Sequence, residues 1–188
     1  MTRIWTRRLV CLAAASSLLL ALSGWQTFSG HKMTGGVHGR YYWLDGSVGP
    51  TLRSQLYSAK WLWGNATQQV AWRESAYRAP AAMEVFDSSQ YLDVCAFVSH
   101  YENGNPYRIQ VENPSRARDW DYARLVTTPY LGGIYCRNDL GILTHEVGHV
   151  MGLAHESSGV AAIMNRSIAG MTYTAPKRDD VRGISYLY

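Results

Sequence analysis

Eleven residues, from His145 to His155, constrain this chain more strongly than any other part of its sequence. His149 stands four residues after His145, and Glu146 follows the first histidine directly. Side chains at positions i and i+4 of a helix share one face, about 5–6 Å apart, so the two imidazoles can bind one metal ion. Apolar residues fall on the other side of this predicted helix and favour packing into a core. They are Leu140, Leu143, Val147, Val150 and Met151.

The third histidine, His155, requires the chain to turn. It follows His145 by ten residues, which is about 15 Å along an unbroken helix and too far for a shared ion. Gly152 permits the turn because glycine adopts the left-handed conformation that ends many helices. The spacing therefore predicts His145, His149 and His155 as the three protein ligands of one tetrahedral zinc ion, with the fourth position open for water.

Glu146 is the predicted catalytic residue. It faces the same cleft as the first ligand, and it lies too close to that ligand along the chain to complete the coordination itself. It is well placed to hold the zinc-bound water, take its proton and pass the proton to the leaving amine. Zinc lowers the pKa of such a water towards about 7, which makes a nucleophile at neutral pH.

The N-terminal residues 1–23 have the layout of a secretory signal peptide. Three arginines precede an apolar run from Leu9 to Leu22, and small residues follow at a cleavage-site spacing. The alternative is an uncleaved membrane anchor, although the run is shorter than the roughly 18–20 residues that span a bilayer. Without this segment the chain has 15 basic and 14 acidic residues. This near balance removes the support for a nucleic-acid partner.

The rest of the chain has the length of one domain and the pattern of an α+β or α/β fold, in which several strands precede the helix that carries the motif. Residues 24–39 are predicted to be a flexible arm or short pro-segment, and residues 40–188 the catalytic domain. A helix is expected over Thr51–Trp63, and we expect Asp139 to cap the motif helix. Strands are expected at Tyr41–Leu44, Val70–Glu74, Met83–Phe86, Asp93–Val98, Tyr107–Val111 and Asp121–Thr127.

Two cysteines, Cys95 and Cys136, remain after the predicted leader is set aside. In an exported protein such a pair predicts a disulfide. The alternative is two buried free thiols.

The motif, with Ile163-Met164-Asn165 downstream, resembles the metzincin clan of zinc endopeptidases, whose signature adds such a methionine turn. Within the clan the chain is most similar to the matrixins. Asp93-Val94 resembles their strand entry, and the stretch from Asp179 to Ile184 resembles their C-terminal helix. The resemblance implies a mixed, mostly parallel twisted sheet with an antiparallel edge strand, an active-site helix and a C-terminal helix. It also implies that Met164 lies beneath the three imidazoles.

A secreted, extracellular, monomeric zinc endopeptidase is therefore the predicted function, with no stable membrane insertion after the leader is cleaved. By the same resemblance, a peptide or protein substrate would bind as an extended, antiparallel strand along a sheet edge, for which Tyr107–Val111 and Tyr122–Val126 are the candidates. Two alternatives stay open: a secreted zinc-binding interaction or inhibitory module without turnover, and a zinc amidase that acts on a non-protein amide.

Some residues depart from the family pattern. Glu156 follows the third histidine where serine is common in matrixins, and Arg166 stands near the methionine turn where astacins carry a tyrosine. His31, His38 and His100 are interpreted as solvated loop residues, so a second, structural zinc is not expected. Calcium is possible but unsupported, because no calcium-binding loop is evident.

Overall fold

The computed structural model describes residues 26–90, 92–107, 118–133, 136–157, 159–166 and 172–188. The predicted signal peptide lies outside these residues. Within them, no helix has both the length and the apolar character that crossing a membrane requires.

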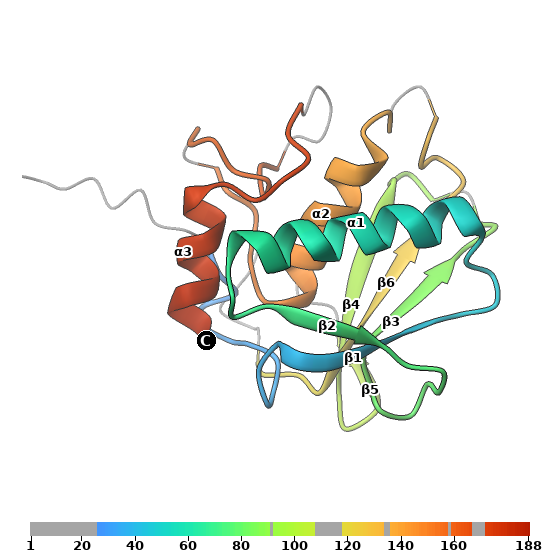
Figure 1. The fold of residues 1–188 in the computed structure, drawn as a ribbon, viewed down its shortest axis with the longest axis horizontal. Helices are drawn as coiled ribbons and strands as arrows, with labels where there is room; N and C mark the ends of the chain where they lie inside the picture. The colour runs from blue at the N-terminus through green and yellow to red at the C-terminus, as the bar shows by residue number, and fades with distance from the viewer. Residues whose placement is uncertain (1–25, 91, 108–117, 134–135, 158, 167–171) are drawn as a thin grey trace, which may run out of the picture.

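A six-stranded mixed sheet forms one layer of the molecule, with strand order β2-β1-β3-β6-β4-β5 (Figure 1). The first four strands in this order are mutually parallel, and β4 runs antiparallel to both β6 and β5. The predicted mixed sheet with an antiparallel edge is confirmed. The strands are β1 (His38–Leu44), β2 (Ala71–Glu74), β3 (Ala81–Asp87), β4 (Ala96–Glu102), β5 (Asn105–Tyr107) and β6 (Tyr122–Thr127).

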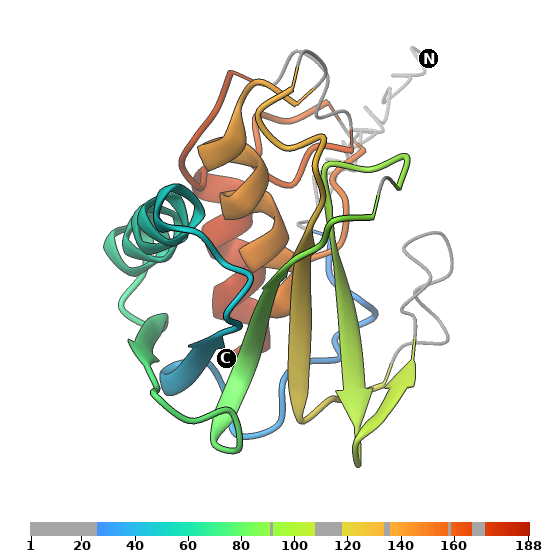
Figure 2. The ribbon, with the colours of Figure 1, turned by 90° about the vertical axis from the view of Figure 1, so that its right-hand side faces the viewer.

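Helices α1 (Pro50–Ala66) and α2 (Asp139–Val150) lie on the same face of the sheet (Figure 2). Helix α1 buries the predicted apolar stripe, and it continues past Gly64 to Ala66 instead of ending at Trp63. The fully buried Trp63 ring donates an indole N–H to Thr144 O of α2 at 2.8 Å. The third helix, α3 (Arg178–Leu187), is the predicted C-terminal helix.

One prediction about the sheet edge is wrong. Strand β6, which contains Tyr122–Val126, lies between β3 and β4 and therefore has no free edge. Of the other candidate, only Tyr107 lies within the described residues, at the end of β5. Strand β4 begins at Ala96, later than predicted, and continues to Glu102.

The N-terminal segment from Gln26 packs against the rest of the domain. Phe28, Met33 and Val37 are buried in the main core cluster. The backbone N–H of Ala154 donates to Gln26 O at 2.8 Å, which ties this segment to the chain that follows α2. The division into a leader, an arm or pro-segment and a catalytic domain stays a prediction.

Candidate metal centre

Helix α2 begins at a side-chain cap. Asn138 is the N-cap residue, and its Oδ1 accepts a hydrogen bond from the backbone N–H of Gly141 at 3.1 Å. The prediction that Asp139 caps the helix is wrong by one residue. Asp139 is the first helical residue, and one of its carboxylate oxygens accepts from Gln55 Nε2 at 3.1 Å. An acid in the first turn still interacts favourably with the helix dipole.

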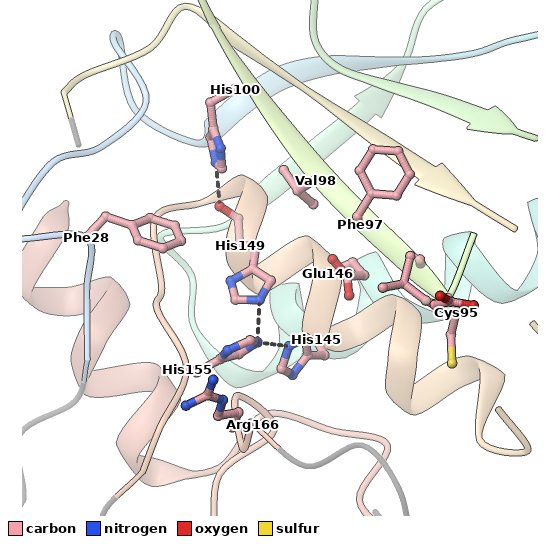
Figure 3. Close-up of a pocket in the computed structure, with 13 residues that line it drawn as sticks. Phe28, Cys95, Phe97, Val98, His100, His145, Glu146, His149, His155 and Arg166 are labelled. Carbon is pink, nitrogen blue, oxygen red and sulfur yellow. Dashed lines mark hydrogen bonds between the residues drawn. The ribbon is translucent and has the colours of Figure 1, made fainter. Parts of the chain in front are cut away.

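Three imidazole nitrogens, two of them from residues of α2, converge at one point beside this helix (Figure 3). The Nε2 atom of His155 lies 3.1 Å from that of His149 and 3.2 Å from that of His145. Ligand nitrogens about 2.0–2.1 Å from a tetrahedral zinc are themselves about 3.3 Å apart, so the spacing fits a zinc centre. The predicted ligand set is brought together by the fold, and it is a group of side chains that could hold a metal ion.

Hydrogen bonds to carbonyl groups orient two of these rings. His145 Nδ1 donates to Ile163 O at 2.8 Å, and His149 Nδ1 donates to Leu153 O at 2.7 Å. A carbonyl oxygen can only accept, so Nδ1 carries the hydrogen in both rings and Nε2 presents a lone pair. Lone pairs aimed at one point repel one another, and a cation between them removes that repulsion.

Burial keeps the three rings neutral. It lowers the pKa of His145 to about 4 and the pKa of His149 well below its ordinary value. The pKa of His155 is lowered first by burial and then by the positive charge of Arg166. Neutral imidazole is the form that binds a metal ion, so the site is ready to bind one at neutral pH.

Glu146 lines the same cavity, of about 390 Å³, as the three histidines. The residue is only 4% exposed, and its carboxyl group lies on the side of the cavity that faces β4 (Figure 3). Burial raises the pKa of Glu146 to about 8. A cation held by the neighbouring imidazoles acts in the opposite direction, because it favours the charged carboxylate.

The turn between the second and third histidines is made at Gly152, as predicted. Its φ angle is +106°, a conformation that side chains other than hydrogen disfavour. A Cβ atom there would lie 3.0 Å from His31 O and 3.0 Å from Leu187 Cδ1. Glycine is therefore required both by the backbone angle and by the surrounding packing.

Comparison with family models adds a decisive observation. Residues 69–188, more than half of the chain, match the matrixin family model. The chain is a matrixin. It therefore contains a zinc metallopeptidase domain of that family, with His145, His149 and His155 as the zinc-binding triad. A comparison with individual curated proteins gave no match.

The matrixin methionine turn lies directly beneath the helix that carries the ligands. Met164 is 2% exposed. A Cβ atom on Gly148 would overlap Met164 Sδ, so the glycine beside His149 permits this close approach. The backbone N–H of Glu156 donates to Met164 O at 2.7 Å, which also ties the segment after His155 to the turn.

Asp180 holds the methionine turn, a role that the sequence did not reveal. Its carboxylate accepts from the backbone N–H groups of Ile163 at 2.8 Å and Met164 at 3.2 Å, and from that of Lys177 at 2.6 Å. Since Ile163 O accepts from His145, α3 is connected to the first ligand through this carboxylate. The available signal was an acid in the first turn of a predicted helix, which does not say what the acid contacts.

His100 is not the solvated loop residue that was predicted. It lies in β4, is 2% exposed and contacts the end of α2, because the strand continues beyond Val98. His38 is exposed but begins strand β1, so it is not a loop residue either. His31 Nδ1 lies 3.2 Å from Asp119 Oδ1. Among the residues that the structure describes, the zinc-binding triad is the one cluster with metal-ligand geometry.

A predicted disulfide and a departure from the family pattern lie at the rim of the cavity. The disulfide between Cys95 and Cys136 is present and connects the segment before β4 to the segment before α2. Arg166 lines the cavity and lies beside His155 (Figure 3), so a positive charge stands where the astacin comparison placed a tyrosine.

Proposed function

We propose that this matrixin domain is a secreted endopeptidase in which Glu146 is the catalytic base. The observation that carries the proposal is the convergence of three neutral imidazoles beside a buried carboxyl group in one open cavity. His145, His149 and His155 would hold a zinc ion. When bound, zinc supplies a Lewis acid that lowers the pKa of water to about 7 and polarises a carbonyl group.

Glu146 would move the protons of the reaction. As the carboxylate, it accepts a proton from the attacking water, and as the acid it donates that proton to the leaving amine. Its position between the histidines and β4 supports this role, because water and the scissile peptide would meet there.

The substrate would bind as an extended strand along β4. This strand pairs with β6 over Ala96–Tyr101, whereas its pairing with β5 covers His100–Glu102. Among the described strands, the second edge of Ala96–Ser99 is therefore open, and Ala96, Phe97 and Val98 line the catalytic cavity. Backbone hydrogen bonds to such an edge would hold any peptide sequence, with side-chain preference left to pockets.

Secretion is supported by the leader-like residues 1–23 and by the disulfide, which is typical of proteins in oxidising compartments. N-terminal sequencing of the exported protein tests this part. A mature N-terminus close to Gly24 is expected, and retention of Met1 on the exported chain would contradict it.

Proteolysis is tested with unfolded casein and one equivalent of zinc, on wild-type protein and on Glu146→Gln. The wild type should cleave peptide bonds, and the variant should keep its zinc and lose at least about a hundredfold in kcat. Equal, near-zero cleavage by both proteins would favour a zinc-binding module without turnover. Cleavage of a non-peptide amide, with no peptide products in a mass-spectrometric screen, would favour the amidase.

A further inference from the structure

The carbonyl groups at the end of α2 are held by donors from four separate parts of the chain. Four consecutive residues contribute these carbonyls, and each accepts one hydrogen bond from a distant residue. The bonds are His100 Nε2 to His149 O (3.0 Å), Trp120 Nε1 to Val150 O (3.2 Å), Tyr188 Oη to Met151 O (2.8 Å) and the Phe28 backbone N–H to Gly152 O (3.2 Å).

This arrangement differs from the usual end of a helix. The last carbonyls of a helix lack intrahelical partners and are usually satisfied by water or by the chain that follows immediately. Here Val150 and Met151 are fully buried, so partners must come from the protein. The side chains of Trp120 and His100 are themselves buried.

The held segment is the turn between the second and third zinc ligands. Its last part supplies Leu153 O, which accepts from His149 Nδ1 and thereby sets the orientation of that ring. The turn at Gly152 also determines where the chain delivers His155. A rotation of the peptide planes at the end of α2 would therefore change the positions of two of the three ligand nitrogens together.

We propose that His100, Trp120 and Tyr188 are positioning residues of the zinc centre, which fix the turn that brings His155 to His145 and His149. The proposal depends on one part of the proposed function, which is that the triad binds zinc. It does not depend on proteolysis. Hydrogen-bonded groups behind metal ligands commonly change metal affinity by about 10- to 100-fold when they are removed.

Tyr188 offers the cleanest single-atom test. Its hydroxyl donates to Met151 O and accepts from the backbone N–H of Met33 at 3.0 Å, so Tyr188→Phe removes both bonds and leaves the ring in place. The matched control is Tyr77→Phe, because the Tyr77 side chain is on the surface with 77% exposure.

Zinc affinity is measured by competition with a chromophoric chelator, at a temperature where both apo variants are folded by circular dichroism. Tyr188→Phe should bind zinc about tenfold more weakly, and Tyr77→Phe should match the wild type. The visible absorption bands of the Co²⁺-substituted Tyr188→Phe protein should shift, because they report ligand geometry. A lower melting temperature with unchanged zinc affinity and unchanged Co²⁺ bands would show a merely structural role and overturn the proposal.

His100 provides an independent pair of variants. The amide of Gln can place an N–H close to the position of the imidazole Nε2, whereas Leu cannot donate. His100→Gln should keep zinc affinity within about twofold of the wild type, and His100→Leu should lose about tenfold. Equal losses in both variants would assign the effect to packing and contradict the positioning role. These zinc-binding assays use no substrate, so their results test the positioning role even if the protein does not cleave casein.

Discussion

Replacing Gly152 with alanine tests the geometry of the zinc turn most sharply. The φ angle of +106° is unfavourable for an L side chain, at a cost of about 1–2 kcal/mol. The added Cβ would also lie 3.0 Å from His31 O, 3.0 Å from Leu187 Cδ1 and 3.2 Å from Trp120 Cη2. Overpacking of this kind costs about 1–3 kcal/mol, and the backbone oxygen cannot move aside as a side chain can. We expect Gly152→Ala to lower the free energy of unfolding by about 2–5 kcal/mol.

The matched control is Gly104→Ala in the β4–β5 turn. Gly104 also has a positive φ angle, +76°, but its Cβ would meet no atom within 4 Å. This variant should lose only the conformational part, about 1–2 kcal/mol. Urea unfolding of the zinc-free proteins measures both costs, and a zinc titration measures the effect on the centre. Equal losses of stability, or wild-type zinc affinity in Gly152→Ala, would refute the reasoning.

Three further outcomes are expected. Replacing Cys95 and Cys136 with serine should lower the free energy of unfolding by about 4 kcal/mol in the loop-entropy model, because the bond spans 41 residues. Urea unfolding measures this change, and a decrease of less than about 1 kcal/mol would contradict the prediction. Burial, with a hydrogen bond and charge from Glu156, raises the pKa of Asp179 to about 6. This pKa exceeds the unfolded value of about 3.9, so Asp179 lowers stability as pH rises from 4 to 6. Asp179→Asn should therefore raise Tm at pH 7 but not at pH 4. An equal rise in Tm at both pH values would contradict the raised pKa of Asp179. His149→Ala should lose stoichiometric zinc, and one retained zinc per chain would exclude the ligand set.

The zinc centre was predictable because its spacing is a local property of the chain. The distance between His145 and His149 follows from helix geometry alone, and Gly152 marks the place where the chain must turn. The fold class followed from the order of strands and helices, and the methionine turn from the family resemblance. These features depend on residues that are close together in the sequence.

The supports of the centre were not predictable in the same way. Asp180 contacts Ile163 and Met164 only after α3 has docked. His100 becomes a core residue because β4 extends beyond Val98 and packs against α2. Such contacts depend on tertiary packing, which a residue's local pattern does not encode.

The edge that lies along the active site was missed for a related reason. The side chains of β6 alternate between buried and half-buried, a pattern that an edge strand and an inner strand can share. The neighbours of β6 in the sheet decide its position, however: β4, which is earlier in the chain, lies between β6 and the short β5, and β5 pairs only with His100–Glu102 of β4. A strand's own sequence seldom specifies its order in a mixed sheet.

X-ray absorption spectroscopy at the zinc edge of the purified wild-type protein tests the central claim most directly. The account predicts one zinc per chain with three imidazole nitrogens at about 2.0–2.1 Å and one further light-atom ligand. A spectrum with two imidazoles, or with sulfur at about 2.3 Å, would contradict the convergence of His145, His149 and His155 on one ion.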